Sequence, residues 1–204
     1  MNLSEDKLKK LVKEEIEKRI QNKKPKRVIT VYDMIHEIFP DQFSKIDYTR
    51  DSKKHAISRA DHVICISENT RVDLINILGI ERDKTSVVHL GFALTPNQFK
   101  SMALQRKPFL LYVGSRGGYK NFYRLVQAYA TSSILLKQFD LICFGGGGFT
   151  QEEVNLFRQF KISPEKIRVV SGDDDLLANY YKNSSLFIYP SLYEGFGIPP
   201  LEAM

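Results

Sequence analysis

The feature that most constrains the fold is a repeated alternation of short apolar runs with stretches of helical periodicity. The apolar runs are rich in Val, Ile, Leu and Phe, which is typical of buried strands. Helical patterns separate consecutive runs, and parallel strands need crossover helices of this kind. The alternation therefore predicts an α/β protein whose parallel sheets are covered by helices on both faces.

The expected elements fall into two series. The first has strands at 26–33, 62–67 and 86–90 and helices at 52–59 and 68–78. The second has strands at 108–113, 140–144, 167–170 and 186–189 and helices at 121–130, 151–160 and 174–183. Residues 91–107 break the rhythm, so we expect one Rossmann-like lobe in 1–90, a linker in 91–107 and a second lobe in 108–204.

Composition narrows the class of protein further. The chain is 43% hydrophobic and 26% charged, and no apolar run approaches the ~20 residues of a membrane span. The net charge of +6 is concentrated in residues 1–27, where Leu, Val and Ile recur at helical spacing. This helix either packs on a sheet or attaches to an anionic membrane surface. Nucleic acid is not an expected partner, because no basic and aromatic residues interleave after it.

The last twelve residues, 193–204 (YEGFGIPPLEAM), carry the strongest functional signal. Glu194 and Glu202 flank a Gly-Phe-Gly turn, and the prolines suit the first turn of a helix. A turn of this kind exposes backbone amides between two carboxylates. Amides bind anions and carboxylates accept hydroxyl groups, so the pattern suits a polyhydroxylated ligand that bears phosphate.

A second glycine turn, 114–121 (GSRGGYKN), follows the first strand of the second series. Ligands of parallel α/β sheets bind outside the carboxyl ends of strands, so this turn should face a site. Arg116 offers a forked cation and Lys120 a point charge, a suitable pair for a diphosphate. The alternative is an ordinary strand–helix turn with two solvated cations. The spacing does not match a Walker A loop.

Other motifs are weaker. The glycine run 145–148 follows a strand and is read as a loop without direct ligand contact. Asp173 and its two acidic neighbours are read as a helix cap, and no His shows metal-ligand spacing. Cys65 and Cys143 lie in apolar runs and are expected to be buried, reduced thiols of a cytosolic protein.

These residues resemble a known family. Glu194 to Glu202 is similar to the E-x7-E signature of retaining glycosyltransferases with the GT-B fold, of the group 1 or family 4 type. The sequence of this motif resembles that of bacterial mannosyltransferases of surface polysaccharide assembly. The resemblance extends back through LLYVGSRGGYKNF, SENTRVDL and VYDMIHEIFP, and so reaches from about residue 27 to the end.

The resemblance implies roles for matched positions. Arg116 and Lys120 would bind the donor diphosphate, Glu202 would hold the ribose, and Glu194 would contact the transferred sugar. Arg116, Lys120 and Glu194 are thereby the expected catalytic residues. The full expected donor-binding set is Gly114, Arg116, Lys120, Glu194, Gly195, Phe196, Gly197 and Glu202. Where many relatives read His-Asp after an early strand, this chain reads Tyr32-Asp33, so the usual histidine is absent from its register.

The implied function is transfer of a sugar, mannose in the first instance, from a nucleotide sugar to a glycan or lipid-linked acceptor. Retention of configuration, no metal or other cofactor, and a cytoplasmic location at the inner face of the membrane are expected. Relatives begin before residue 1 and continue past residue 204, so both lobes are expected to be incomplete. The alternative is an inactive truncated remnant that binds a nucleotide or a partner at most. An epimerase or phosphorylase of the same fold is a further reading.

Overall fold

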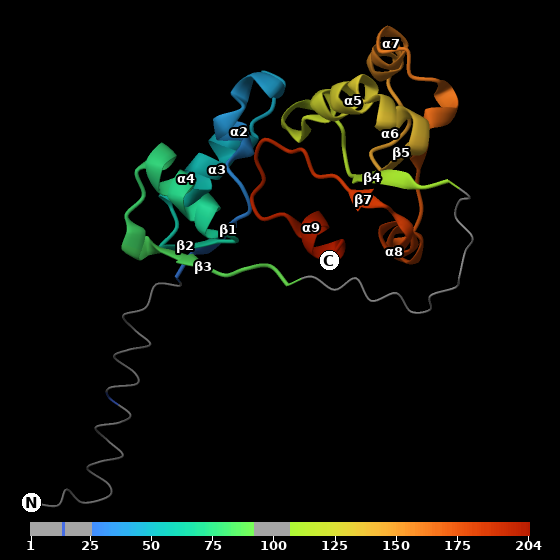
Figure 1. Ribbon diagram of the computed structural model, residues 1–204. Helices are drawn as coiled ribbons and strands as arrows, with labels where there is room; N and C mark the ends of the chain where they lie inside the picture. Colours follow the sequence, from blue (N-terminus) through green and yellow to red (C-terminus); the bar gives the residue numbers. More distant parts are fainter. Residues whose placement is uncertain (1–13, 15–25, 92–106) are drawn as a thin grey trace, which may run out of the picture.

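The computed structural model describes residues 14, 26–91 and 107–204. Residues 26–91 and 107–204 form two parallel α/β lobes side by side (Figure 1). The predicted amphipathic helix of the first 27 residues and the linker 91–107 lie almost entirely outside the described residues. Among the described residues no helix is long and apolar enough to cross a bilayer.

The first lobe contains a three-stranded parallel sheet in the order β1-β2-β3. Its elements in chain order are β1 (Val28–Val31), α2 (Ile35–Ile38), η1 (Pro40–Gln42), α3 (Thr49–Ser58), β2 (His62–Cys65), α4 (Glu68–Leu78), η2 (Arg82–Lys84) and β3 (Thr85–Val87). Helix α3 begins three residues before the predicted start, and the side chain of Asp47 accepts a hydrogen bond from the amide of its first residue, Thr49, at 2.9 Å. Helix α4 is capped by Ser67, as the sequence suggested.

The second lobe contains a four-stranded parallel sheet in the order β6-β5-β4-β7. Its elements are β4 (Phe109–Val113), η3 (Gly118–Lys120), α5 (Phe122–Thr131), α6 (Ser133–Gln138), β5 (Asp140–Phe144), α7 (Gln151–Gln159), η4 (Pro164–Lys166), β6 (Ile167–Val170), α8 (Asp174–Asn183), β7 (Leu186–Phe187) and α9 (Ile198–Glu202). Three predicted elements, 140–144, 167–170 and 174–183, have the observed bounds. The predicted strand 186–189 is shorter, since only two of its residues pair with β4.

The two sheets are covered differently. In the second lobe α5, α6 and α7 lie on one face and α8 on the other, and all five residues of β5 are buried (Figure 1). In the first lobe the described helices α2, α3 and α4 lie on a single face, and β2 alternates between buried and half-buried residues. The prediction of helices on both faces is therefore confirmed for the second lobe, whereas the described residues cover only one face of the first sheet.

The cores follow this arrangement. One cluster joins the second sheet to α5 and α7 through Leu110, Phe122, Val126, Tyr129 and Phe157, among others. A second joins the opposite face to Tyr180 and Tyr181 of α8. Both cysteines are free, and both side chains are fully buried, Cys65 in the first lobe and Cys143 in the second.

Candidate functional site

The candidate site lies where the order of strand addition in the second sheet reverses. Strand β4 has β5 on one side and β7 on the other, so the loops that leave β4 and β7 diverge and open a crevice. The two loops are tied together locally. The side-chain amide of Asn121 donates to the carbonyl of Pro190 at 3.0 Å, and the Leu192 amide donates to the carbonyl of Tyr119 at 2.9 Å.

Lys120 and Glu194 meet in this crevice. The Lys120 ammonium lies 2.6 Å from a carboxylate oxygen of Glu194, and the two side chains are 21% and 17% exposed. A pocket is lined by this pair, by the 195–197 turn, and by Tyr32 and Asp33 of the first lobe. A cation in the lining of a pocket, beside the backbone of a glycine turn, can exchange its carboxylate partner for an anionic ligand.

Tyrosines surround the pair. Tyr119 and Tyr189 line the same pocket. Burial, and after it the negative charge of Glu194, raises the pKa of Tyr189. Burial also raises the pKa of Tyr119, against the influence of Lys120. Both phenols are therefore neutral near pH 7 and can donate hydrogen bonds to a ligand.

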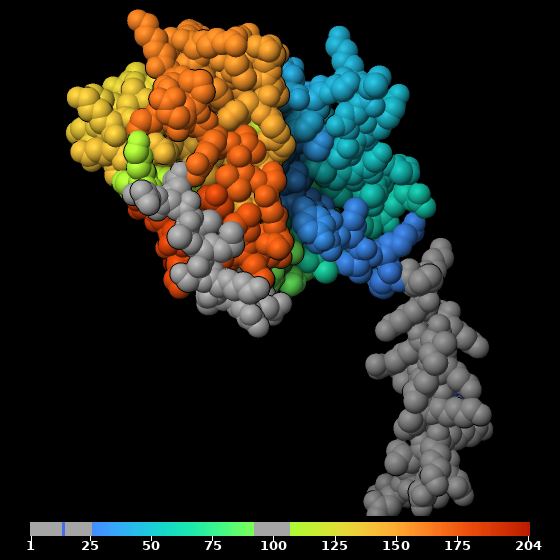
Figure 2. Space-filling view, turned by 90° about the vertical axis from the view of Figure 1, so that its right-hand side faces the viewer, coloured from blue at the N-terminus to red at the C-terminus, as the bar shows by residue number. Residues whose placement is uncertain are grey.

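The loop after β7 is held against the first lobe by its backbone at Gly195. The hydroxyl groups of Ser67 and Thr70 both donate to the Gly195 carbonyl, the latter at 3.1 Å. A Cβ at position 195 would lie 1.9 Å from the backbone oxygen of Tyr32, so only glycine fits. Figure 2 shows the first lobe, in blue and cyan, against the second, in orange. The contact at Gly195 makes the pocket a feature of both lobes.

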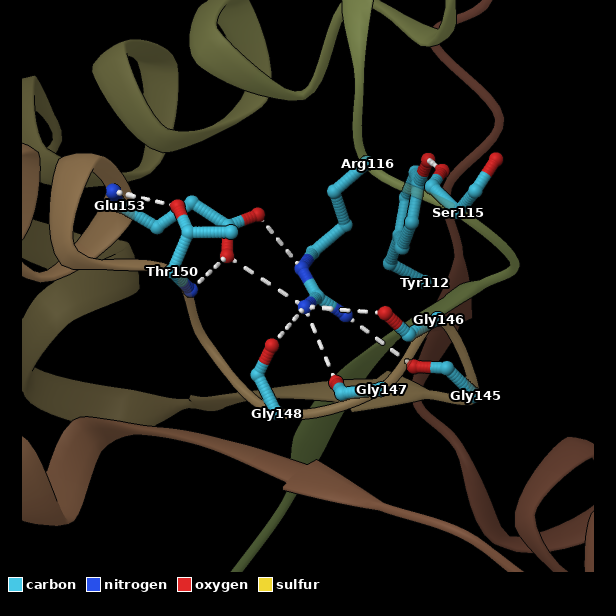
Figure 3. A network of polar contacts seen from close by, with 9 residues as sticks. All are labelled: Tyr112, Ser115, Arg116, Gly145, Gly146, Gly147, Gly148, Thr150 and Glu153. Carbon is cyan, nitrogen blue, oxygen red and sulfur yellow. Dashed lines mark hydrogen bonds and ion pairs between the residues drawn. The ribbon is translucent and has the colours of Figure 1, made fainter.

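Arg116 does not line this pocket, and Figure 3 shows its guanidinium beside Glu153 and the glycine run. Its side chain is 3% exposed, and its Nε lies 2.7 Å from a carboxylate oxygen of Glu153. The two terminal nitrogens donate to the carbonyls of the glycine run, at 3.1 Å to Gly145, 3.4 Å to Gly146, 3.0 Å to Gly147 and 2.8 Å to Gly148. The rings of Phe122 and Phe149 lie 5.8 and 5.0 Å from the guanidinium carbon. The reading of Arg116 as a solvated surface cation is wrong.

The glycine run is the other half of this network. Gly145, Gly146 and Gly147 all have positive φ, between 72° and 79°, which turns their carbonyls toward Arg116. A Cβ on Gly146 would lie 2.6 Å from the carbonyl oxygen of Gly114, so the two turns are in close contact. Gly114 also donates its amide to the Phe144 carbonyl at 2.9 Å. The sequence indicated a loop at 145–148, but not what its carbonyls bind.

Glu202 lies in helix α9, away from the lining of the pocket. It accepts a hydrogen bond from the Tyr181 hydroxyl at 2.9 Å, which fixes its orientation in the free protein. Phe196 does line the pocket, and its ring lies 5.6 Å from that of His89. The predicted set therefore divides into a group around Lys120 and Glu194, a separate network at Arg116, and Glu202 on the following helix.

Several residues of the site were not expected from the sequence as ligand-facing groups. Tyr32, Asp33, Tyr119 and Tyr189 line the pocket, and Thr70 holds the loop from a fully buried position. The absence of a histidine before Asp33 was the one signal that pointed to Tyr32. Asp173 caps α8 by accepting from the Leu176 amide at 2.9 Å, as predicted. Within 26–91 and 107–204, no three His, Cys, Asp or Glu side chains gather as metal ligands.

Two parallel α/β lobes with a pocket between them, at the carboxyl ends of strands, are the architecture of GT-B glycosyltransferases. The family model described as glycosyl transferases group 1 matches residues 95–204, more than half of the chain. The chain belongs to the group 1 glycosyltransferase family, which confirms the resemblance.

Known proteins support this assignment. The chain is 26% identical over 184 residues to the O-antigen chain mannosyltransferase RfbU of Salmonella typhimurium, covering 87% of this chain and 49% of that protein. It is 30% identical over 182 residues to the serotype-specific mannosyltransferase WbdA of Escherichia coli, covering 75% of this chain and 20% of that one.

A solved structure shows the same fold. Sucrose-phosphate synthase of Thermosynechococcus elongatus superimposes with a TM-score of 0.67 at 22% identity, covering 91% of this chain and 49% of the synthase. The chain spans about half the length of RfbU and of the synthase (49% of each) and 20% of WbdA.

Proposed function

We propose that this chain supplies the donor pocket of a hexosyltransferase that moves a sugar, mannose in the first instance, from a nucleotide sugar to a glycan or lipid-linked acceptor. The observation that carries the proposal is the pocket at the strand switch point. It brings Lys120 and Glu194 together with the 195–197 backbone and with Tyr32 and Asp33 of the other lobe. The mannosyltransferases among the relatives support mannose as the first sugar to test.

Each lining group has a role that suits its chemistry. Lys120 binds the diphosphate and stabilises the negative charge that develops on it as the leaving group. Glu194 is released from Lys120 by the diphosphate and accepts hydrogen bonds from hydroxyl groups of the transferred sugar. The amides around Phe196 and Gly197 bind the phosphate or the sugar, and Glu202 accepts from the ribose hydroxyl groups, with Tyr181 holding it in place.

The proposed step retains the configuration of the sugar. The bond between the anomeric carbon and the donor phosphate oxygen breaks, and a bond to the acceptor hydroxyl oxygen forms on the same face. The proton of that hydroxyl passes to the departing phosphate oxygen. Glu194 is paired with Lys120 at 2.6 Å and is assigned to binding rather than to nucleophilic attack.

We further propose that no metal ion or other cofactor takes part. The charge released with the diphosphate is met by an ammonium group and by backbone amides, which is sufficient in a preorganised site. A lipid-linked acceptor would place the reaction in the cytoplasm at the inner face of the membrane. The basic, amphipathic sequence pattern of residues 1–27 is the feature that supports this location. Flotation with vesicles that contain anionic lipids tests it.

The proposal is tested by calorimetric titration of GDP, UDP, dTDP and ADP and of their nucleotide sugars. We expect one nucleoside diphosphate to bind, and Lys120→Gln to weaken it about 10- to 100-fold, as expected for loss of a charge-assisted contact. Lys84→Gln is the matched control, because Lys84 forms a surface pair with Glu81 at 3.3 Å outside the pocket.

Binding of none of these nucleotides by the wild-type chain would contradict the proposal. Retention is tested separately, by ¹H NMR of the anomeric configuration of the transferred sugar. An inverted product would overturn the assigned stereochemistry and leave donor binding intact.

A further inference from the structure

Arg116 makes an unusual set of contacts for a cation in a predicted phosphate-binding turn. Glu153 and four backbone carbonyls of residues 145–148 accept from its guanidinium, whose side chain is 3% exposed. Glu153 is itself fixed, because it forms a capping box with Thr150 at the start of α7. Figure 3 shows Glu153 and the carbonyls of the glycine run placed around the guanidinium.

We propose that Arg116 is a positioning residue that fastens the glycine turn 145–148 to the turn after β4, and that it does not bind the donor diphosphate. In this role it acts through the backbone that carries Lys120, which is four residues further on. The statement about the diphosphate rests on the proposed function, whereas the fastening does not.

The arrangement of the carbonyls supports this role. Three successive glycines with positive φ aim their carbonyls at one place, and such aligned dipoles repel one another unless a donor lies between them. A forked guanidinium can donate to several oxygens at once and also pair with a carboxylate. Withdrawing it toward a phosphate would leave Glu153 and the carbonyls without their partner, which costs free energy.

The contact between the two turns shows how Arg116 can influence the pocket without lining it. Gly146 lies so close to Gly114 that a Cβ would approach the Gly114 carbonyl to 2.6 Å and the Arg116 guanidinium to 2.9 Å. The turn that begins at Gly114 ends at Lys120, whose ammonium faces Glu194. In the described part of the chain, Lys120 is the one Lys or Arg in the pocket lining.

The fastening is tested without any ligand, by peptide-level hydrogen exchange of residues 145–153 in Arg116→Lys. Lysine keeps the charge, but its ammonium cannot form the fork with Glu153 and also reach the glycine carbonyls. We expect exchange in this segment to rise about tenfold or more. Glu153→Gln keeps the side-chain size and should raise exchange in the same segment. The double variant should add less than the sum of the two, since the residues act as a unit.

Arg124→Lys is the matched control, because Arg124 lies on α5, outside this network, and donates to the side chain of Gln127 at 2.9 Å. It should leave exchange at 145–153 unchanged. Unchanged exchange in Arg116→Lys as well would overturn the inference. If Arg116→Lys fails to fold, the milder Glu153→Gln decides the question by the same measurement.

The diphosphate statement is tested by titrating GDP, UDP, dTDP and ADP, and the corresponding nucleosides, against wild type and Arg116→Lys. A positioning role predicts that the affinity ratio of nucleoside diphosphate to nucleoside falls in the variant only together with a rise in exchange at 145–153, because Arg116 acts on the diphosphate through the turn that carries Lys120. Phosphate binding by Arg116 would instead lower that ratio and spare exchange at 145–153. Should wild type bind none of the nucleotides, the proposed function fails, and hydrogen exchange still decides the fastening.

Discussion

Two ion pairs have their cations in the same turn, 114–121, but differ in their surroundings. Lys120 pairs with Glu194 in an open pocket, with side chains 21% and 17% exposed. Arg116 pairs with Glu153 in a closed network, with side chains 3% and 15% exposed, and four backbone carbonyls add to it. The first pair can accept a ligand in place of its partner, whereas the second has no room for one.

The difference between the two pairs shows that the charge and sequence position of a cation do not establish whether it binds a ligand. A buried pair whose partners are all satisfied contributes to structure, and breaking it is costly. A pair in a pocket that water can enter contributes less to stability, because water partly screens it. Substitution of Arg116 should therefore mainly lower stability, whereas substitution of Lys120 should mainly weaken ligand binding.

Arg116→Gln should have the largest effect on stability. It leaves Glu153 and the glycine carbonyls without a donor, so the free energy of unfolding should fall by about 3–5 kcal/mol. Lys120→Gln should lower it by about 1 kcal/mol or less. Urea denaturation followed by circular dichroism measures both. Equal losses in the two variants would remove the distinction between the pairs.

Gly195→Ala should have the next largest effect on stability, and it should also change the pocket. The new Cβ would lie 1.9 Å from the Tyr32 carbonyl oxygen, so the loop must shift from the first lobe. We expect a loss of about 1–3 kcal/mol, typical of overpacking, together with weaker nucleotide binding. Gly117→Ala is the control, since nothing lies within 4 Å of its Cβ position. A Gly195→Ala protein with unchanged melting and binding would show that this contact does not shape the pocket.

Thr70→Val should have a smaller effect at the same contact. It removes one of two hydroxyl donors to the Gly195 carbonyl and keeps the side-chain shape, which should cost about 1 kcal/mol. Thr131→Val removes an exposed hydroxyl that bonds to its own helix at 2.9 Å and should be close to neutral. Thermal melting of the two variants side by side measures the difference. A Thr131→Val variant that loses as much as Thr70→Val would contradict a special role for the buried hydroxyl.

The smallest expected effect is local opening of the structure around a cysteine, which can be followed through the two thiols. Burial raises the pKa of Cys143 to about 12, and burial also raises the pKa of Cys65. The folded state therefore holds both thiol protons more tightly than the unfolded state, whose thiols titrate near pH 9. Stability from this source is present below about pH 9 and declines as the pH rises toward 12.

Thiol titration with a disulfide reagent at pH 8 checks this expectation. Neither thiol of the wild-type protein should react rapidly. Cys143 directly precedes Phe144 and the glycine run, so Arg116→Gln should raise its reactivity, whereas Lys120→Gln should not. Cys65, in the other lobe, serves as the reference within the same molecule. Rapid reaction of both thiols in Arg116→Gln would indicate general unfolding in place of local opening.

Much of the local structure could be predicted from the sequence. Strand 140–144 and helix 174–183 have the predicted bounds, and Ser67 and Asp173 cap the helices that follow them. Strand burial and helix capping depend on residues a few positions apart, so a local pattern contains the necessary information. Helix α6 was missed, although Ser132 caps it by accepting from the Leu135 amide at 3.3 Å, because its apolar residues follow α5 without a break.

The candidate site was predictable in part. Lys120 and Glu194 were predicted to lie near one crevice from the glycine turns, the order of the strands and the sequence motif around Glu194. The structure brings the Lys120 ammonium to 2.6 Å from the Glu194 carboxylate. The pocket residues contributed by the first lobe, Tyr32 and Asp33, depend on the docking of Gly195 against that lobe. No short-range pattern describes contacts between lobes.

By itself, the sequence determined the α/β class, the two series of parallel strands and the glycosyltransferase family, because all three reside in local periodicity and in continuous motifs. Only the tertiary structure decided which cation of the 114–121 turn faces the pocket. Arg116 is captured by carbonyls about thirty residues away, which gather only when three glycines adopt positive φ and β5 pairs with β4. Lys120 is left for the ligand because Glu194, its single carboxylate partner in the described chain, lies with it in the lining of the pocket.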